Sequence, residues 1–250
     1  MSSRIKQHFN PTRKCCTDGP LQEWYSNKQL RSLKFYKDGI IDGESISWYR
    51  NGQILSRKFY RNGKLEGKSE YWHKNGEIWR RELRQNGKLE GERTEWYDDG
   101  QLHEQETYWH GKIHGNAKSW HPNGLIWTCK FYRKGGIEGE YKTWYENGHL
   151  YERRFCSNGE REGNRTCWDK NGRPMICEFY KRGKRNGESK EWGERGEICM
   201  YEFYQDDRLI DENFNSAKKR AFLRIIKYFQ RNMTAPINTT LISDLMRIIS

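Results

Sequence analysis

Apolar residues are scarce in this chain of 250 residues. Hydrophobic side chains make up 34% of it and the mean hydropathy is −1.18, too little aliphatic material for the thick core of a compact globule. No run approaches the roughly 18 apolar residues that span a bilayer. The first residues also lack the apolar stretch of a signal peptide. We therefore expect an intracellular, cytoplasmic protein that is neither secreted nor membrane-spanning.

Signatures of catalysis and of metal binding are missing as well. The chain has no Gly-rich phosphate loop, no G-x-S-x-G and no H-E-x-x-H motif. The paired-cysteine spacing of structural zinc is absent. The seven cysteines, an odd number, argue against a complete disulfide framework. The sequence thus predicts no enzyme activity, no cofactor, no bound metal and no small-molecule substrate.

Aromatic residues and glycine are plentiful, which sets the chain apart from disordered segments. It holds 11 Trp, 15 Tyr, 10 Phe and 24 Gly. Eight glycines recur every 24 residues from Gly19 to Gly187, and a tryptophan follows each of them by five residues. A register kept this strictly marks a repeat architecture. The repeated tryptophans are Trp24, Trp48, Trp72, Trp96, Trp120, Trp144, Trp168 and Trp192.

Most repeats contain two further glycines, about eleven residues apart, usually preceded by asparagine; the first repeat has Asn27-Lys28 at one of these places. Asn-Gly between β-prone runs indicates a two-residue hairpin turn, because both central residues need a positive φ. The turn glycines include Gly52, Gly63, Gly76, Gly87, Gly100, Gly111, Gly124, Gly148, Gly159, Gly172 and Gly183. The intervening runs are rich in residues that suit a pleated surface. The repeats therefore predict a mainly β fold, an elongated single-layer antiparallel solenoid of eight β-hairpins over residues 19–210.

The turns also predict a register and two faces. A two-residue loop at Asn51-Gly52 pairs Trp48 with Leu55, and one at Asn62-Gly63 pairs Tyr60 with Leu65. By alternation, one face carries Trp48, Leu55 and Phe59, and the other carries Tyr49, Ile54, Tyr60 and Leu65. A shift of one residue would exchange the faces.

One repeat departs from the pattern in a way that should weaken its pairing. Pro174 stands where most repeats have an aliphatic residue, and the predicted register pairs it with Asp169. Proline has no N–H to give to a ladder. We therefore expect a bulge or weakened pairing at Pro174.

The 24-residue unit resembles the MORN repeat, in the variant form found in bacterial antitoxin-like proteins of the YwqK type. The shared signatures are W-Y-x-N-G and F-Y-x-[ND]-G-K-x-x-G, and the resemblance covers residues 19–210. It implies an elongated hairpin array that scaffolds protein partners or dimerises, and an older proposal adds phospholipid binding. Long arrays with a short basic tail also resemble proteins of large DNA viruses of amoebae. An antitoxin-like inhibitor of a partner protein is a special case of the scaffold role.

The net charge of +12 is concentrated at the two ends of the chain. Residues 1–18, a basic segment that we expect to be flexible, carry a net +3, and residues 211–250 carry +4. The 192 residues between them carry +5, with both signs interleaved. A nucleic-acid groove requires a stripe of one sign. The sequence shows no such stripe, so nucleic acid is not an expected partner.

The C-terminal segment has a helical period. Phe222, Ile225, Ile226 and Phe229 follow the i, i+3, i+4, i+7 rule of an amphipathic helix, and a second short helix is expected near the end. Two roles are open: a cap over the last strand, or a basic helix that docks on an acidic partner or a membrane. The candidate contact residues are Lys218, Lys219, Arg220, Arg224, Lys227 and Arg231.

The sequence therefore predicts a non-enzymatic scaffold that binds a protein partner or a second copy of itself. The alternative is peripheral association with anionic membrane lipid through the basic C-terminal helix.

Overall fold

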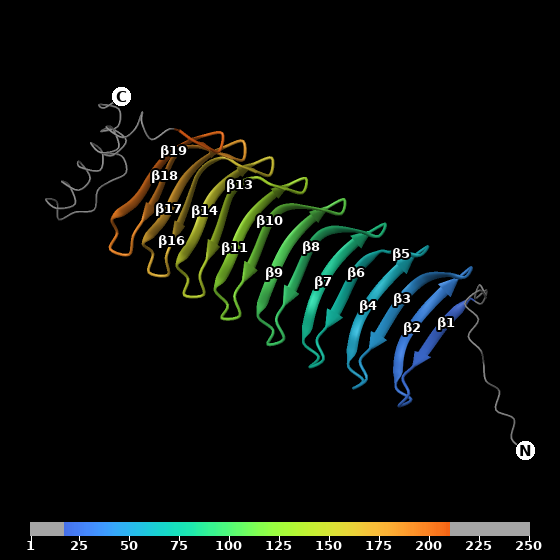
Figure 1. Cartoon of the computed structure of the whole chain (residues 1–250). Helices are drawn as coiled ribbons and strands as arrows, with labels where there is room; N and C mark the ends of the chain where they lie inside the picture. The colour runs from blue at the N-terminus through green and yellow to red at the C-terminus, as the bar shows by residue number, and fades with distance from the viewer. Residues whose placement is uncertain (1–17, 211–250) are drawn as a thin grey trace, which may run out of the picture. The chain divides into compact units, whose positions relative to one another are not determined.

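The computed structural model describes residues 18–210, which divide after residue 160 into two compact units. Figure 1 shows the strands of the first unit side by side in one layer. Its strands are β1 (Gly19–Trp24), β2 (Leu30–Lys37), β3 (Ile40–Trp48), β4 (Ile54–Arg61), β5 (Lys64–Leu65), β6 (Gly67–Trp72), β7 (Ile78–Gln85), β8 (Lys88–Trp96), β9 (Leu102–Trp109), β10 (Lys112–Trp120), β11 (Ile126–Arg133), β12 (Gly136–Ile137), β13 (Gly139–Trp144) and β14 (Leu150–Ser157). Each pairs antiparallel with its neighbour in sequence, and β4 and β11 also pair with β6 and β13.

The second unit is built in the same way. The short β15 (Glu160–Arg161) lies where the two units meet in the sequence. The strands that follow are β16 (Gly163–Trp168), β17 (Pro174–Lys181), β18 (Lys184–Trp192), β19 (Ile198–Gln205) and β20 (Arg208–Leu209). They pair antiparallel in chain order. The predicted mainly β architecture is therefore confirmed for residues 18–210, which contain no helix. The predicted C-terminal helical cap lies outside the described residues.

The second turn of each repeat is the two-residue turn that the sequence predicted. Asn62 and Gly63 have φ values of 49° and 77°, and Arg61 faces Lys64 across the turn. Positive φ at both central residues defines the type I′ turn, whose twist matches that of the strands. The predicted pairs Tyr60–Leu65, Tyr108–Ile113 and Tyr132–Ile137 are confirmed.

The first turn is one residue longer than predicted, and the predicted Trp48–Leu55 pair is wrong. The amide of Gly52 donates to Tyr49 O, and the amide of Tyr49 donates to Gln53 O. Gly52 has a positive φ of 85°, whereas Asn51 does not. This is the three-residue loop with a bulged glycine, in which only the last loop residue is left-handed. Trp48 therefore faces Ile54.

A β-bulge beside this turn corrects the predicted faces. Ser47 pairs with Ser56 and Trp48 pairs with Ile54, which leaves Leu55 as the extra residue. Rings at the Leu55 position contact rings at the Tyr49 position, as in Tyr97–His103 (4.5 Å between centroids). Position 55 thus joins the tyrosine face, and Ile54 joins the tryptophan face, because two residues of a bulge oppose one on the partner strand.

Pro174 occupies this same bulge and does not create it. Trp168 pairs with Pro174 as Trp48 pairs with Ile54, with the same register shift. The predicted Asp169–Pro174 pair is wrong, because the amide of Asp169 donates to Arg173 O. Proline is tolerated because it is the first residue of β17. A bulge specific to this repeat is therefore not observed.

Candidate interaction surface

The tryptophan row is held in place by a hydrogen bond from one repeat to the next. Tyr49 Oη donates to the backbone oxygen of Trp72 at 2.8 Å. Where histidine replaces tyrosine, its Nε2 takes the same place, as in His121 beside Trp144 O at 2.9 Å. The other bonds of this kind join Tyr25 to Trp48, His73 to Trp96 and Tyr97 to Trp120. These bonds fix the residue at which the first turn of the following repeat begins.

The turn asparagine explains why Asn precedes glycine in the first turn although it is not left-handed there. Asn51 Oδ1 accepts from the amide of Gln53, and Asn51 Nδ2 donates to Lys74 O in the next repeat at 3.0 Å. Asn75 and Asn123 make the same pair of bonds. One side chain thus closes its own turn and joins it to the following one.

The second turns are joined through the acidic residue that follows them. The carboxylate of Asp42 accepts from the amide of Asn62, and the amide of Gly63 donates to Ile41 O. Glu66, Glu90 and Glu138 accept in the same way from the next turn along the chain. Both edges of the first unit are therefore tied repeat to repeat, which makes the sheet a regular platform for side chains.

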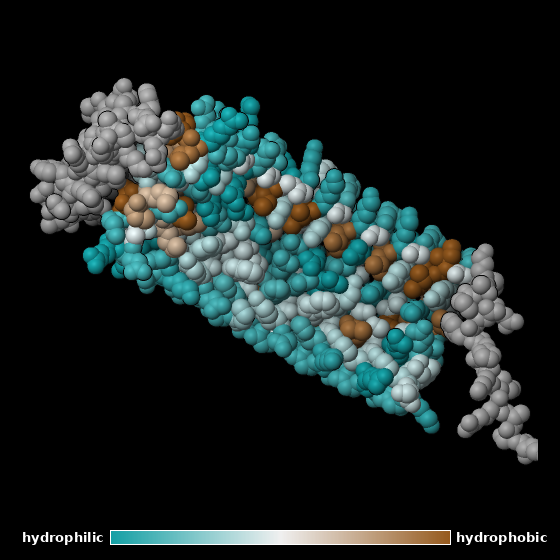
Figure 2. Space-filling view, in the orientation of Figure 1, coloured by the Kyte–Doolittle hydropathy of each residue, from teal (hydrophilic) through white to brown (hydrophobic). Residues whose placement is uncertain are grey.

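We call the tryptophan side of the first unit the aromatic face. It holds the tryptophan row from Trp24 to Trp144, together with an outer apolar row. The outer row consists of Phe35, Phe59, Leu83, Phe131 and Phe155, exposed by 36–45%, and Thr107 stands at the same repeat position. The rows persist because each residue type returns to one register every 24 residues. On the side that Figure 2 displays, apolar residues appear as separate spots in a hydrophilic surface.

Two of the glycines that recur every 24 residues make room for an outer-row side chain. Gly43 has a φ of 105°, and a Cβ at this position would lie 3.3 Å from Phe35 Cβ. A Cβ at Gly91 would likewise lie 3.5 Å from Leu83 Cδ1. At Gly43 and Gly91 the glycine therefore provides both the backbone conformation and the space over which the preceding outer-row residue lies, whereas a Cβ at Gly67 or Gly139 would meet no atom within 4 Å.

Charged pairs separate the apolar side chains of the aromatic face. Arg57 Nε lies 3.2 Å from Glu44 Oε1, and about half of each side chain is exposed. The guanidinium of Arg81 lies over the Trp96 ring at 5.6 Å from its centroid. Tryptophan, phenylalanine and arginine side by side form the mixture that is enriched where interfaces derive most of their binding energy.

The opposite side, the ionic face, buries charge instead. Glu82 is only 1% exposed, accepts from Arg84 Nε at 2.8 Å, and forms an ion pair with Arg80 Nε at 3.5 Å. Tyr71 Oη donates to the same carboxylate at 3.3 Å. The Arg80 guanidinium also covers the Tyr71 ring, 4.1 Å from its centroid. Most of these polar groups are satisfied internally, so this face is the less suitable docking surface.

In the next repeat a single arginine side chain pairs with three carboxylates. Arg93 donates to Glu106 at 2.6 Å and to Glu104 at 3.3 Å, and it also pairs with Glu95. Burial, reinforced by the neighbouring Glu106 carboxylate, raises the pKa of Glu104. Burial and the hydrogen bond to Glu106 raise the pKa of Tyr108 to about 12. These shifts accompany a shared structural network and require no catalytic role.

The edge formed by the second turns carries a row of exposed basic residues, which we call the basic edge. Its members in the first unit are Lys37, Arg61, Lys64, Lys88, Lys112, Arg133 and Lys134. None of the seven has an ion-pair partner within the residues that the structure covers. Of the acidic residues at this edge, Asp42 and Glu66 are half-buried and accept from turn amides, whereas Asp38 in a second turn is exposed.

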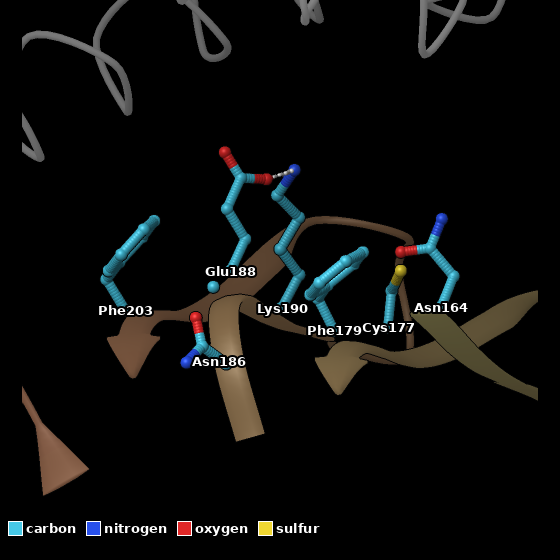
Figure 3. Close-up of a pocket in the computed structure, with 8 residues that line it drawn as sticks. Asn164, Cys177, Phe179, Asn186, Glu188, Lys190 and Phe203 are labelled. Atoms are coloured by element: carbon cyan, nitrogen blue, oxygen red, sulfur yellow. Dashed lines mark ion pairs between the residues drawn. The ribbon is translucent and has the colours of Figure 1, made fainter. Parts of the chain in front are cut away.

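The second unit has a shallow groove on its own tryptophan side. Phe179 on β17 and Phe203 on β19 stand on either side of β18, and Figure 3 shows both rings rising on the side from which Glu188 and Lys190 project. Asn164 and Cys177 complete one end. The hollow encloses about 330 Å³.

Comparison with known protein families identifies the repeat. Five stretches of the chain match the model described as the MORN repeat variant, at residues 17–38, 41–62, 55–73, 89–110 and 137–155. The chain carries variant MORN repeats. The resemblance seen in the sequence is thereby confirmed, and MORN repeats are generally non-enzymatic modules for interaction with proteins or membranes. The comparison with curated proteins found no match.

Some of the predicted site residues lie within the described MORN array and others lie beyond it. The six basic residues from Lys218 to Arg231 lie outside it. Within residues 18–210, no three His, Cys, Asp or Glu side chains are grouped to hold a metal ion. In the same range no helix is long and apolar enough to cross a membrane. The predicted turn glycines all have positive φ values, and the seven tryptophans that recur every 24 residues from Trp48 to Trp192 are half-buried.

Sequence reasoning missed the basic edge and the ionic face. The net charge of the eight repeats taken together, +5 over 192 residues, is small and conceals the basic residues that flank the second turn in most repeats. The available signal was the recurrence of Lys or Arg next to Asn-Gly, as in Arg61 and Lys64. The buried carboxylate of Glu82 had no such signal, because it replaces Lys58 of the preceding repeat.

Proposed function

We propose that the protein is a non-enzymatic scaffold that binds a protein partner, or a second copy of itself, through the aromatic face. The observation that carries this proposal is the outer row of exposed apolar residues. Phe59 is 42% exposed and Phe155 is 39% exposed, each beside a half-buried tryptophan row. Full burial of such a side chain contributes about 1.5–3 kcal/mol, and somewhat less than half of that, roughly 1 kcal/mol each, is still to be gained here, so a partner must cover several of them to bind.

The regular spacing favours an elongated partner. Two strands separate consecutive outer-row residues, and strands lie about 4.8 Å apart, so these residues are spaced by roughly 10 Å. The inter-repeat hydrogen bonds hold this spacing in the absence of a partner, which lowers the entropic cost of binding. An inhibitor of a partner protein, as in antitoxins, would use the same surface.

The scaffold role is tested by removing the outer row without disturbing the fold. A Phe59→Ser/Phe131→Ser variant should lose the partner that the parent chain captures from its native cell, or lose dimers seen by light scattering. Leu125→Ser is the matched control, since Leu125 is equally exposed (43%) but lies in a first turn. Equal capture and equal oligomeric state for all three proteins would refute the aromatic face as the binding surface.

A second function, peripheral association with anionic lipid, is favoured by the basic edge. Seven exposed Lys and Arg without ion-pair partners in the described chain present positive charge along one edge of the first unit. Each basic residue near an anionic surface contributes about 1 kcal/mol. The predicted basic C-terminal helix would add to this attraction.

Sedimentation with anionic vesicles separates the two contributions. The full chain should bind with strong salt dependence, a chain ending at residue 210 should bind more weakly, and a Lys64→Ser/Lys88→Ser/Lys112→Ser variant should lose part of the binding. Absence of salt-sensitive binding by the full chain would rule out this function. Unchanged binding by the triple variant would assign it to the C-terminal segment alone.

A further inference from the structure

The groove on the second unit keeps two phenylalanine rings partly exposed to solvent. Phe179 and Phe203 remain 40% and 37% exposed although they flank a common hollow. Gly187 forms the floor between them, where a Cβ would lie 3.3 Å from Phe179 Cβ. Two strand spacings separate β17 from β19, so the rings stand roughly 10 Å apart. The ion pair between Glu188 and Lys190 lies between the rings, so apolar side chains that dock here would pack on the two aromatic rings and on the aliphatic stems of this pair.

The described chain ends beside this groove. Leu209 on β20 pairs with Tyr204 on β19, and the amide of Ile210 donates to Phe203 O at 2.9 Å. Forty residues follow residue 210 in the sequence. Even a short extended linker covers the distance, because each residue spans up to about 3.5 Å.

The sequence of those forty residues matches the groove in chemistry. Phe222, Ile225, Ile226 and Phe229 fall on one side of the predicted amphipathic helix, and the basic residues Lys218, Arg224 and Lys227 fall among the polar positions. A stripe of four apolar residues needs a complementary apolar surface. The exposed pair of phenylalanines on either side of Gly187 offers such a surface next to the end of β20.

We propose that residues 211–250 dock on this groove of the same chain, with the Phe222–Ile226 stripe against Phe179 and Phe203. The segment then covers the tryptophan side of the last two repeats and not only the edge of the last strand. A partner that uses this side of the second unit competes with the chain's own C-terminal segment. The inference stands apart from the proposed role of the first unit's aromatic face.

Two cysteines allow a direct test in the full-length protein. Cys177 lines the groove, whereas Cys129 holds the same position of the repeat in the first unit and is also half-buried. Substituting Phe222→Asp and Ile226→Asp should raise the alkylation rate of Cys177 about tenfold and leave that of Cys129 unchanged. An unchanged Cys129 rate and an unchanged far-UV circular dichroism spectrum of the repeats show that the fold is retained.

A cross-link identifies the occupant. In an Ile226→Cys variant, a short bismaleimide should join Cys177 to the new thiol within one chain, as shown by the peptide mass and the monomer band. Cross-links that appear only in dimers would overturn the proposal in favour of a second copy. Equal alkylation of Cys177 in the parent and the Phe222→Asp/Ile226→Asp variant, without an intramolecular cross-link, would overturn docking altogether.

Discussion

Neutralising the buried carboxylate of Glu82 should destabilise the array far more than neutralising an exposed one. Glu82 is 1% exposed and pairs with Arg84 Nε at 2.8 Å and with Arg80 Nε at 3.5 Å. Glu82→Gln keeps the volume but leaves the Arg84 guanidinium, 24% exposed, without its anion, and leaves Arg80, 22% exposed, with only the longer ion pair to Glu95 at 3.8 Å. Breaking a buried pair costs about 3–5 kcal/mol, and the partial exposure of the arginines reduces this to about 2–3 kcal/mol.

Glu44→Gln is the matched control on the other face of the sheet. Its partner Arg57 lies at a similar distance, 3.2 Å, but the two side chains are 44% and 50% exposed. Exposed ion pairs contribute less than about 1 kcal/mol. The two variants therefore remove the same chemical group from two environments, and the expected costs differ because Glu82 is buried and has more partners than Glu44.

Hydrogen exchange measured by mass spectrometry suits this comparison, because stability in a repeat array is local. Peptides covering β7 and β8 should lose protection by roughly 30- to 150-fold in Glu82→Gln, the equivalent of 2–3 kcal/mol. Peptides covering β3 and β4 should lose less than about fivefold in Glu44→Gln. If both variants changed exchange equally, the argument from burial would be wrong.

Three further predictions follow from single positions. Ser69 Oγ is buried and has no hydrogen-bond partner in the described chain, so Ser69→Ala should leave the urea midpoint unchanged or raise it, whereas Ser119→Ala, which breaks the 2.7 Å bond to Thr128, should cost about 1 kcal/mol. Lys28 has a left-handed φ of 68°, so Lys28→Gly should stabilise the first repeat by about 1 kcal/mol in the same assay, and a loss would contradict a strained lysine. The pKa of Glu104 is raised, first by burial and then by Glu106, so its carboxyl favours folding only while it is protonated, and this contribution is lost as pH rises through the raised pKa. Glu104→Gln should therefore be more stable than the parent near neutral pH, with the difference shrinking toward about pH 4; a difference that grows in acid would reverse the assigned direction.

The turns show how far sequence reasoning reached. It identified the second turn correctly, because Asn62-Gly63 supplies two residues that tolerate positive φ. The prediction of the same two-residue turn at Asn51-Gly52 was wrong, because the loop there has three residues. The dipeptide Asn-Gly also suits a loop in which only the glycine is left-handed, and the asparagine side chain then donates a hydrogen bond to the next repeat. A hydrogen bond between residues 23 positions apart, such as Asn51 to Lys74, leaves no signal in the local sequence.

The candidate surface was predictable in its residues but not in its grouping. The period of 24 placed the tryptophans in one row, and alternation placed Phe59 near Trp48. The bulge that moves Leu55 to the other face, and the burial of Glu82 among arginines, depend on contacts with neighbouring strands.

The sequence by itself determined the repeat, its two glycine turns and the absence of an aliphatic core, because these are properties of composition and period. Only the tertiary structure decided which side chains beside the first turn share a face, since the bulge there exchanges the faces of Ile54 and Leu55 and restores the register from Ser47–Ser56 onward. It alone separated a face of exposed phenylalanines from a face of buried ion pairs, and it placed the last described residue, Ile210, beside Phe203. These are consequences of strands lying side by side, which a linear pattern does not contain.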